Sequence, residues 1–185
     1  MLDNKGAFYI FIRYIFLALI AFNGLYLFYL IFTPLTVYPV FFILKLLASN
    51  VSLSETTVII NLVNIELVQA CIAGAAYYFL LVLNFTTPLS IEKRIRSLSF
   101  LIFSFLVLNI IRIVVFSLLA VNNFSLFNIT HKLFWYLGST ILVVAIWFAS
   151  AYLFKIKSVP VYSDFREIYE SINLRKKRPS KVRKR

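Results

Sequence analysis

The stretch that decides the fold runs from residue 97 to residue 121 and reads SLSFLIFSFLVLNIIRIVVFSLLAV, with Arg112 as its single charged residue. About 20 consecutive apolar residues cross the hydrocarbon core of a bilayer as a helix, so this stretch predicts a membrane-spanning helix. The whole composition agrees, because 62% of the 185 residues are hydrophobic and 14% are charged, against about 25% charged in a soluble domain. We therefore expect an all-α integral membrane protein.

Three further apolar stretches predict spanning helices, at residues 7–32, 67–88 and 132–154. The first is long enough to cross with tilt and lacks the cleavage site of a signal peptide, so we expect it to be retained. Residues 37–48 are too short to cross and contain Lys45, which predicts an interfacial helix or re-entrant segment. Residues 51–66 are rich in Val, Ile and Thr, which predicts a short extracytoplasmic strand or hairpin in water at the membrane surface.

The distribution of Lys and Arg predicts the orientation in the membrane. The tail, residues 155–185, carries eleven basic and three acidic residues, and the short loop between the second and third expected helices carries Lys93, Arg94 and Arg96. Because cytoplasmic loops are enriched in Lys and Arg, we expect this loop and the tail inside the cell.

Helix parity completes the expected topology. A membrane domain of residues 1–154 with four crossings places both ends of the chain in the cytoplasm and residues 33–66 and 122–131 outside. The tail of residues 155–185 then faces the anionic lipid of the inner leaflet. Nucleic acid is the alternative partner for a basic run, but residues 175–185 lack interleaved aromatic side chains, so we expect no nucleic-acid binding.

Three residues in the outer half of the expected membrane domain carry the candidate chemistry. At 1.5 Å per residue, Cys71 lies about 6 Å and Arg112 about 13 Å from the outer ends of their helices, and His131 lies where the fourth helix enters. A thiol beside an imidazole provides a nucleophile and a general base that returns the proton to the leaving amine. We therefore predict Cys71 as nucleophile, His131 as general base and acid, and Arg112 as the stabiliser of the substrate carbonyl and oxyanion.

Each of these residues also has a structural interpretation. A lone Cys packs as a small hydrophobe, and a His at a helix end lies at the interface. An Arg inside a spanning helix costs roughly 2.5–3.5 kcal/mol, which makes Arg112 a functional candidate, although Glu66 or helix carbonyls are alternative structural partners. One Cys and one His exclude a disulfide framework and leave little for a metal site, so we expect no metal and no cofactor.

The local motifs are Gln69-Ala70-Cys71-Ile72-Ala73-Gly74, then Asn109-Ile110-Ile111-Arg112, then His131. Over roughly residues 50–150 this pattern resembles the archaeosortase/exosortase family of membrane cysteine transpeptidases, which carry an Ala-Cys-small-Gly motif, an Asn-x-x-Arg motif and a later His or Arg. The chain has one more residue before Gly74 than the commoner Cys-Ser/Thr-Gly form. Its His131 is more similar to the exosortases than to archaeosortases that carry Arg there.

The resemblance implies a cysteine protease or transpeptidase that sorts proteins at the outer face of a prokaryotic cell membrane. Its partners would be exported proteins that end in a short motif, a spanning helix and a basic cluster, with a lipid as candidate acceptor of the new C-terminus. The atypical motif and short chain favour an archaeon. Small residues fit a docked substrate helix or packing within the protein's own bundle: Ala70, Ala73, Gly74, Ala75 and Ala76.

Two interpretations from other classes stay open. A non-enzymatic membrane assembly or lipid-binding protein would use Arg112 and Glu66 structurally and the tail on anionic lipid. A small transporter subunit would line its path with Arg112, but paired Gly or Pro breaks in corresponding segments, which mark transporters, are missing from the sequence. Labelling of Cys71 by a thiol reagent from outside the cell is the most informative observation.

Overall fold

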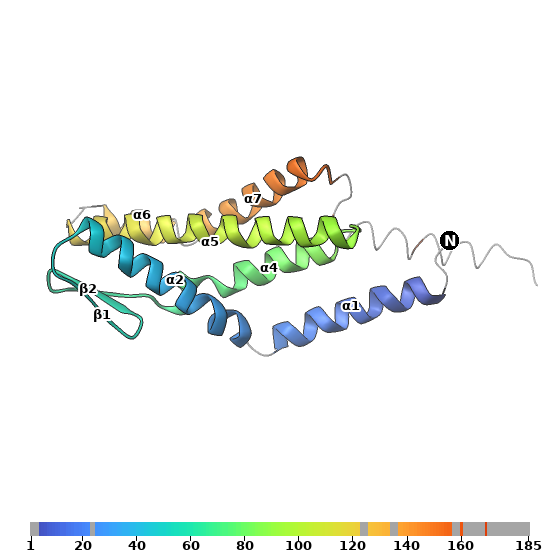
Figure 1. The fold of residues 1–185 in the computed structure, drawn as a ribbon, viewed down its shortest axis with the longest axis horizontal. Helices are drawn as coiled ribbons and strands as arrows, with labels where there is room; N and C mark the ends of the chain where they lie inside the picture. The colour runs from blue at the N-terminus through green and yellow to red at the C-terminus, as the bar shows by residue number, and fades with distance from the viewer. Residues whose placement is uncertain are drawn as a thin grey trace, which may run out of the picture.

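The structure, a computed structural model, describes residues 4–22, 25–122, 126–133 and 137–156, together with residues 160 and 169. Most of the described chain is helical, and one small sheet lies at one end of the molecule (Figure 1). The elements in chain order are α1 (Asn4–Phe22), α2 (Tyr26–Leu47), β1 (Val51–Ser54), β2 (Thr57–Ile60), β3 (Val63–Glu66), α3 (Gln69–Ile72), α4 (Gly74–Phe85), α5 (Ile91–Val121), α6 (Phe127–Leu133) and α7 (Ser139–Leu153).

The helices follow one long axis, and the chain travels repeatedly between the two ends of the molecule (Figure 1). α1 and α2 follow each other toward the sheet, α3 and α4 lead back, and α5 runs to the sheet end again, where α6 lies. α7 then leads away from the sheet. The start of α1, the α4–α5 loop and the end of α7 consequently lie at the end opposite the sheet.

The central element of the bundle is α5, which packs against α2, α4 and α7. Its buried residues recur every three or four positions, as expected of a helix face turned toward a core: Ser97, Leu101, Phe105, Asn109, Ile110, Ile113, Val114 and Ser117. Tyr77 of α4 stacks on Phe32 of α2 with 3.6 Å between ring centroids, and it meets Phe105 of α5 edge-on at 4.8 Å. These rings join three helices in one apolar core.

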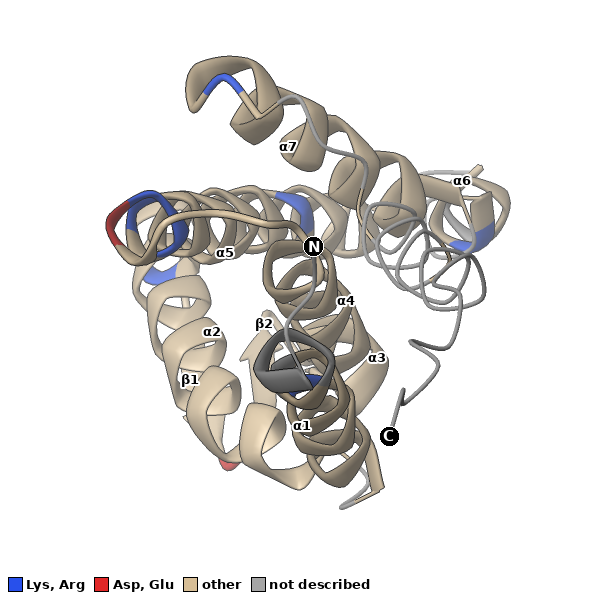
Figure 2. Ribbon diagram, turned by 90° about the vertical axis from the view of Figure 1, so that its right-hand side faces the viewer, with Lys and Arg blue, Asp and Glu red and all other residues tan. Residues whose placement is uncertain are grey.

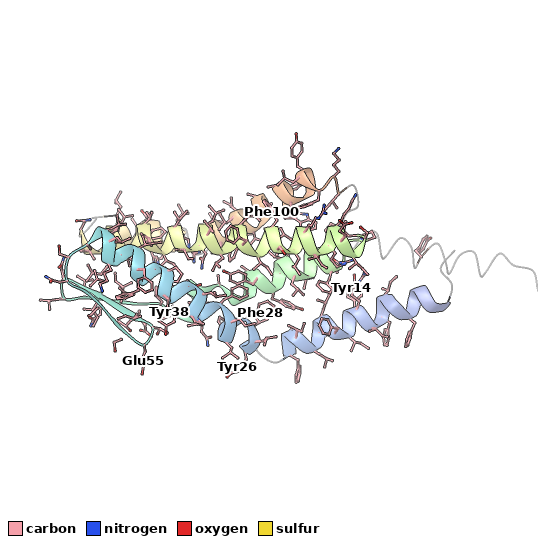
Figure 3. All side chains as sticks on the ribbon, viewed as in Figure 1. Tyr14, Tyr26, Phe28, Tyr38, Glu55 and Phe100 are labelled. Carbon is pink, nitrogen blue, oxygen red and sulfur yellow. The ribbon has the colours of Figure 1, made fainter. Side chains whose placement is uncertain are left out.

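Large apolar side chains cover the outside of the bundle. On α1 alone the exposed ones are Phe8, Phe11, Ile12, Ile15, Phe16, Leu19 and Phe22. Lys and Arg form only short patches on the ribbon (Figure 2), and side chains project outward along all the helices (Figure 3). Apolar surface of this extent is typical of a protein covered by lipid or by a partner. By length and composition, α2 and α5 are able to cross a membrane, whereas the apolar parts of the other helices are shorter.

The predicted helix 7–32 is wrong as a single element. The structure divides it into α1, which ends at Phe22, and α2, which begins at Tyr26. Residues 23–24 lie outside the described residues, but Leu25 has a left-handed backbone with φ 59°. A continuous right-handed helix does not allow that conformation.

Residues 37–48 were expected to form a separate interfacial helix or re-entrant segment, but they are continuous with the helix before them. Residues 37–47 form the second half of α2, a helix of 22 residues that contains Pro34 and Pro39. Its buried side chains include Thr36, Val40 and Leu44, so tertiary packing supports a helix that length alone did not indicate. α1 and α2 run in the same direction, so they make one passage toward the sheet. The start of α1 and the end of α7 therefore both lie at the end opposite the sheet (Figure 1).

The other expected helices occur with different boundaries. The helix predicted at 97–121 begins earlier, at Ile91, and ends at Val121 as predicted. The helix predicted at 132–154 corresponds to the end of α6 and to α7, and residues 134–136 between them lie outside the described residues. The helix predicted at 67–88 is divided into α3 and α4. That four helices span a membrane therefore stays a prediction.

The strands predicted within residues 51–66 are confirmed as a three-stranded antiparallel sheet in the order β1-β2-β3. Alternate positions place apolar side chains on one face, including the fully buried Val58 and Ile60, and mostly polar side chains on the other. A two-residue turn of Asn61 and Leu62, both with positive φ, joins β2 to β3, as the twist of a tight hairpin requires.

A buried polar cluster joins α4, α5 and α7 at the end opposite the sheet. Asn84 Nδ2 donates to Ser97 Oγ at 3.0 Å, and the hydroxyl oxygens of Ser97 and Ser150 lie 2.9 Å apart. Arg94 donates to the carbonyl oxygens of Asn84 and Phe85 at 2.6 and 3.0 Å. A cation at a helix C-terminus is favourable because carbonyl groups are unpaired there, so the cluster fixes the end of α4.

Replacing Ser97 tests the contribution of this cluster. Ser97→Ala should lower the free energy of unfolding by about 1–2 kcal/mol, because it leaves the buried Asn84 amide and Ser150 hydroxyl without their partner. Ser99→Ala, at an exposed position of the same helix, should change it by less than about 0.5 kcal/mol. Denaturant unfolding of the purified proteins in micelles measures both values, and equal stability of the two variants would contradict the prediction.

Candidate active site

The helix predicted at residues 67–88 breaks at Ala73, two residues after Cys71. α3 ends at Ile72, Ala73 has a left-handed backbone with φ 59° and ψ 42°, and α4 begins at Gly74. A non-glycine residue in that conformation costs roughly 1–2 kcal/mol, so surrounding contacts must hold it. The break falls where this chain has two residues, Ile72 and Ala73, in place of the single residue of the commoner motif.

Two side chains of α5 hold the main chain at this break. Asn109 Nδ2 donates to the carbonyl oxygen of Cys71 at 2.9 Å, and Arg112 Nη2 approaches the same oxygen at 3.4 Å. Residues three apart in a helix share a face, so the Asn-x-x-Arg spacing aims both groups at one acceptor. Asn109 is fully buried, and a buried amide N–H without a hydrogen-bond partner is unfavourable. The contact to Cys71 therefore stabilises the break.

The guanidinium of Arg112 also reaches α7. Its Nη1 donates to the hydroxyl oxygen of Ser139 at 2.6 Å, so the side chain bridges α3, α5 and α7. Of the two structural partners expected from the sequence, a helix carbonyl is therefore found, at Cys71. Ser139 was missed; the available signal was a hydroxyl in the Gly138-Ser139-Thr140 stretch near the outer end of the last expected helix.

A cavity of about 570 Å³ brings the three predicted residues together. Cys71 comes from α3, Arg112 from α5 and His131 from α6, and all three residues line the cavity. Its lining residues come from the segment from β3 to α3, the second half of α5 and α6, and the sheet and α6 lie at the same end of the molecule (Figure 1). Its wall consists of Val63, Asn64, Ile65, Glu66, Leu67, Val68, Ala70, Cys71, Arg112, Ile113, Phe116, Ser117, Ala120 and His131.

The burial of the three residues differs in a way that suits different roles. Cys71 and Arg112 are half-buried, whereas His131 is exposed. The imidazole of His131 meets the ring of Phe116 edge-on, with 5.5 Å between centroids. Cys71 and Arg112 are therefore partly covered by the wall of the cavity, whereas His131 presents more of its surface to the outside.

The small residues after Cys71 divide between two surroundings. Gly74 is buried, and a Cβ atom at this position would lie 2.8 Å from Cε1 of Tyr29 in α2. Packing within the protein's own bundle therefore explains Gly74. Ala70 and Ala75 are exposed, so they are the members of the group whose surface is open to a substrate helix.

The described residues offer no group of three or more His, Cys, Asp or Glu side chains that would hold a metal ion. The polar side chains in the cavity wall are the thiol of Cys71, the imidazole of His131, the guanidinium of Arg112, the carboxylate of Glu66, the amide of Asn64 and the hydroxyl of Ser117. This set is suited to nucleophilic attack and proton transfer.

Comparisons with protein-family models, with curated proteins and with solved structures find no match for this chain. The chemistry of the cavity and the motifs that its residues form are the features that bear on function. The two kinds of observation concern the same residues, because the motif positions Cys71, Arg112 and His131 all belong to the cavity wall.

Thiol labelling in intact cells tests the accessibility of the cavity. A membrane-impermeant maleimide should modify Cys71 from outside, because this half-buried side chain lines a cavity at the sheet end. The chain has one Cys, so Cys71→Ala is a complete negative control. Mass spectrometry of the purified chain measures the modified fraction. Modification by a permeant maleimide alone would contradict an outward-facing cavity.

Proposed function

We propose that this protein is a membrane-embedded cysteine transpeptidase that cleaves C-terminal sorting signals of exported proteins. The observation that carries the proposal is the single cavity walled by Cys71, Arg112 and His131. A nucleophile, a base and a cation around one space are the groups that acyl transfer requires. The resemblance of the motifs to the archaeosortase/exosortase family supports the same reaction.

In the first half of the proposed reaction, the sulfur of Cys71 attacks the carbonyl carbon of the scissile peptide bond. His131 takes the thiol proton and returns it to the nitrogen as the C–N bond breaks. The released C-terminal piece, with its spanning helix, leaves as an amine. The exported protein is left as a thioester on Cys71.

In the second half, a hydroxyl or amine of the acceptor attacks the thioester carbonyl, and a lipid headgroup is the acceptor we favour. His131 takes the proton of the attacking group and passes it to the sulfur as the C–S bond breaks. The exported protein leaves joined to the acceptor, and Cys71 returns to its thiol form. No cofactor enters either half of the reaction.

Arg112 is suited to stabilise the oxyanion because of its number of donors. A guanidinium has five N–H groups in a planar fork, and the described contacts to Ser139 and to the Cys71 carbonyl involve one on each terminal nitrogen. The contact to Cys71 also keeps this fork beside the nucleophile's own main chain. The other N–H groups serve the substrate oxygen.

The proposed membrane arrangement has four crossings: α1 with α2, then α3 with α4, then α5, then α7. It is supported by the exposed apolar side chains of the bundle and by the position of Lys93, Arg94 and Arg96 at the start of α5, opposite the sheet. The basic end belongs in the cytoplasm, so the cavity faces outside the cell. The chain resides in a prokaryotic cell membrane, with an archaeon favoured.

A second candidate function is a non-enzymatic assembly or lipid-binding protein. The observation in its favour is that Arg112 already has structural partners, the Cys71 carbonyl and the Ser139 hydroxyl. This arrangement explains Arg112 without a substrate. It leaves unexplained why Cys71 and His131 lie in the wall of the same cavity.

Substitutions at the three residues distinguish these functions. Cys71→Ala should abolish processing of partner proteins, and Cys71→Ser should nearly do so, since a hydroxyl is a poor nucleophile without stronger base assistance. Arg112→Lys should also fail, because an ammonium cannot reproduce the planar fork. His131→Ala should slow cleavage by about 10²–10⁴-fold, whereas Lys132→Ala, beside it on α6, should not.

The measurement is mass spectrometry of the C-terminal ends of exported membrane proteins in cells that carry each variant. Uncleaved partners with their C-terminal helix should accumulate in the Cys71→Ala cells. Normal processing of every partner in those cells would exclude the transpeptidase and leave the non-enzymatic function.

Protease protection tests the proposed topology. Protease added to intact cells should leave residues 155–185 attached, because the basic tail lies in the cytoplasm, and should remove them after the membrane is opened. An antibody against the tail follows both treatments. Removal of the tail from intact cells would contradict the topology.

A further inference from the structure

Strand β3 lies along the wall of the cavity that contains Cys71. The consecutive lining residues from this part of the chain are Val63, Asn64, Ile65, Glu66, Leu67 and Val68. Neighbouring residues of a strand point to opposite faces of a sheet, so a cavity lined by all four residues of β3 lies along the strand's edge. β2 pairs with the other edge, which means that the cavity follows the outer edge of β3.

Hydrogen-bonding groups of the β3 main chain point toward this cavity. The sheet order β1-β2-β3 gives β3 a strand neighbour on one side only among the described residues. Leu67 donates its N–H to the carbonyl of Thr56, its partner across the register, at 3.0 Å. In an antiparallel ladder, residues that hydrogen-bond to the neighbouring strand alternate with residues that do not. Leu67 is of the first kind, so Glu66 and Asn64 are of the second kind. Their N–H and C=O groups point away from β2, toward the cavity.

The wall of the cavity also includes one face of α5, so a strand and a helix both line it. The lining residues of α5 recur at helical spacing: Arg112, Ile113, Phe116, Ser117 and Ala120. β3 spans about 13 Å at 3.3 Å per residue, and Cys71 follows it closely in the chain. The volume of about 570 Å³ lies within the range of roughly 300–1,000 Å³ typical of ligand sites.

We propose that the outer edge of β3 binds an extended segment of the exported partner by strand addition and delivers its scissile bond to Cys71. This inference rests on the proposed function and names how its substrate is held. Alternating N–H and C=O groups along an edge match an extended polypeptide. A helix already uses these groups internally, and an acyl chain has none, so the segment next to the scissile bond is a strand.

The two faces of β3 predict the side chains of the bound segment. Val63 and Ile65 are half-buried on one face, whereas Asn64 and Glu66 are exposed on the other. An added strand alternates in the same way. Its apolar side chains lie beside Val63 and Ile65, and its polar side chains lie beside Asn64 and Glu66. Glu66 is the acidic residue among the described lining residues, so it favours a cationic or hydrogen-bond-donating neighbour.

Proline at position 64 tests the edge without removing the strand. Asn64→Pro deletes the outward N–H, and proline is tolerated on an edge strand where that group does not bond to the neighbour. We expect a fall of about tenfold in kcat/KM, mainly through KM. The substrate is a partner protein whose processing stops in Cys71→Ala cells. Asn64→Ala keeps the N–H and removes only the side chain, so its KM should rise clearly less than that of Asn64→Pro.

Hydrogen exchange provides a second test that needs no proline. In the Cys71→Ala protein, the amides of Asn64 and Glu66 should become protected when the uncleaved partner is added. If Asn64→Pro leaves the maleimide-labelling rate of Cys71 unchanged, the site of this variant is folded and its KM is a valid test. If the labelling rate changes, the hydrogen-exchange measurement alone tests strand addition.

The outcomes separate this inference from the proposed function. Equal KM values for Asn64→Pro and Asn64→Ala in folded protein, or no gain of protection at Asn64 and Glu66, would overturn strand addition while cleavage by Cys71 stands. If Cys71→Ala leaves all partners processed, the proposed function fails and strand addition falls with it.

Discussion

The carbonyl oxygen of Cys71 is the acceptor on which the arrangement of the site depends. In an unbroken helix it would accept the N–H of Ala75, but the left-handed Ala73 ends α3 before that bond forms. Asn109 and Arg112 of α5 donate to it instead. Net contributions of about 0.5–1.5 kcal/mol per hydrogen bond, or more where the donor is charged, are comparable with the roughly 1–2 kcal/mol that the left-handed residue costs.

This contact gives Arg112 a structural and a proposed catalytic role that are compatible. A partly buried guanidinium needs partners for its charge, and the Cys71 carbonyl and Ser139 hydroxyl provide them. The same partners fix the guanidinium next to the nucleophile, so little side-chain entropy is lost when a substrate carbonyl arrives. The planar fork suits this double use, because its donors point in several directions.

Much of the architecture follows from local patterns, and the rest depends on tertiary contacts. The apolar stretch of α5 and the Val, Ile and Thr of residues 51–66 predict their structures because each pattern is long or regular. The continuation of α2 through Pro34 and Pro39 depends on burial of Thr36 and Val40 against the bundle, which no local pattern encodes. The expected depth of Cys71, Arg112 and His131 in the membrane predicted that they share one region. The helix break at Ala73 and the contact to Ser139 depend on tertiary packing, which no local pattern indicates.

The composition of the cavity wall bears on whether the proposed thioester is transferred to an acceptor or hydrolysed by water. Most of its side chains are apolar, including Ile65 and Leu67 on one side and Ile113 and Phe116 on the other. In the proposed reaction, such a wall would shield the thioester from bulk water and favour an acceptor that enters from the membrane. His131 is the exposed member of the three predicted site residues. A mostly apolar cavity wall is therefore more compatible with the proposed acyl transfer to a lipid than with release of a free acid.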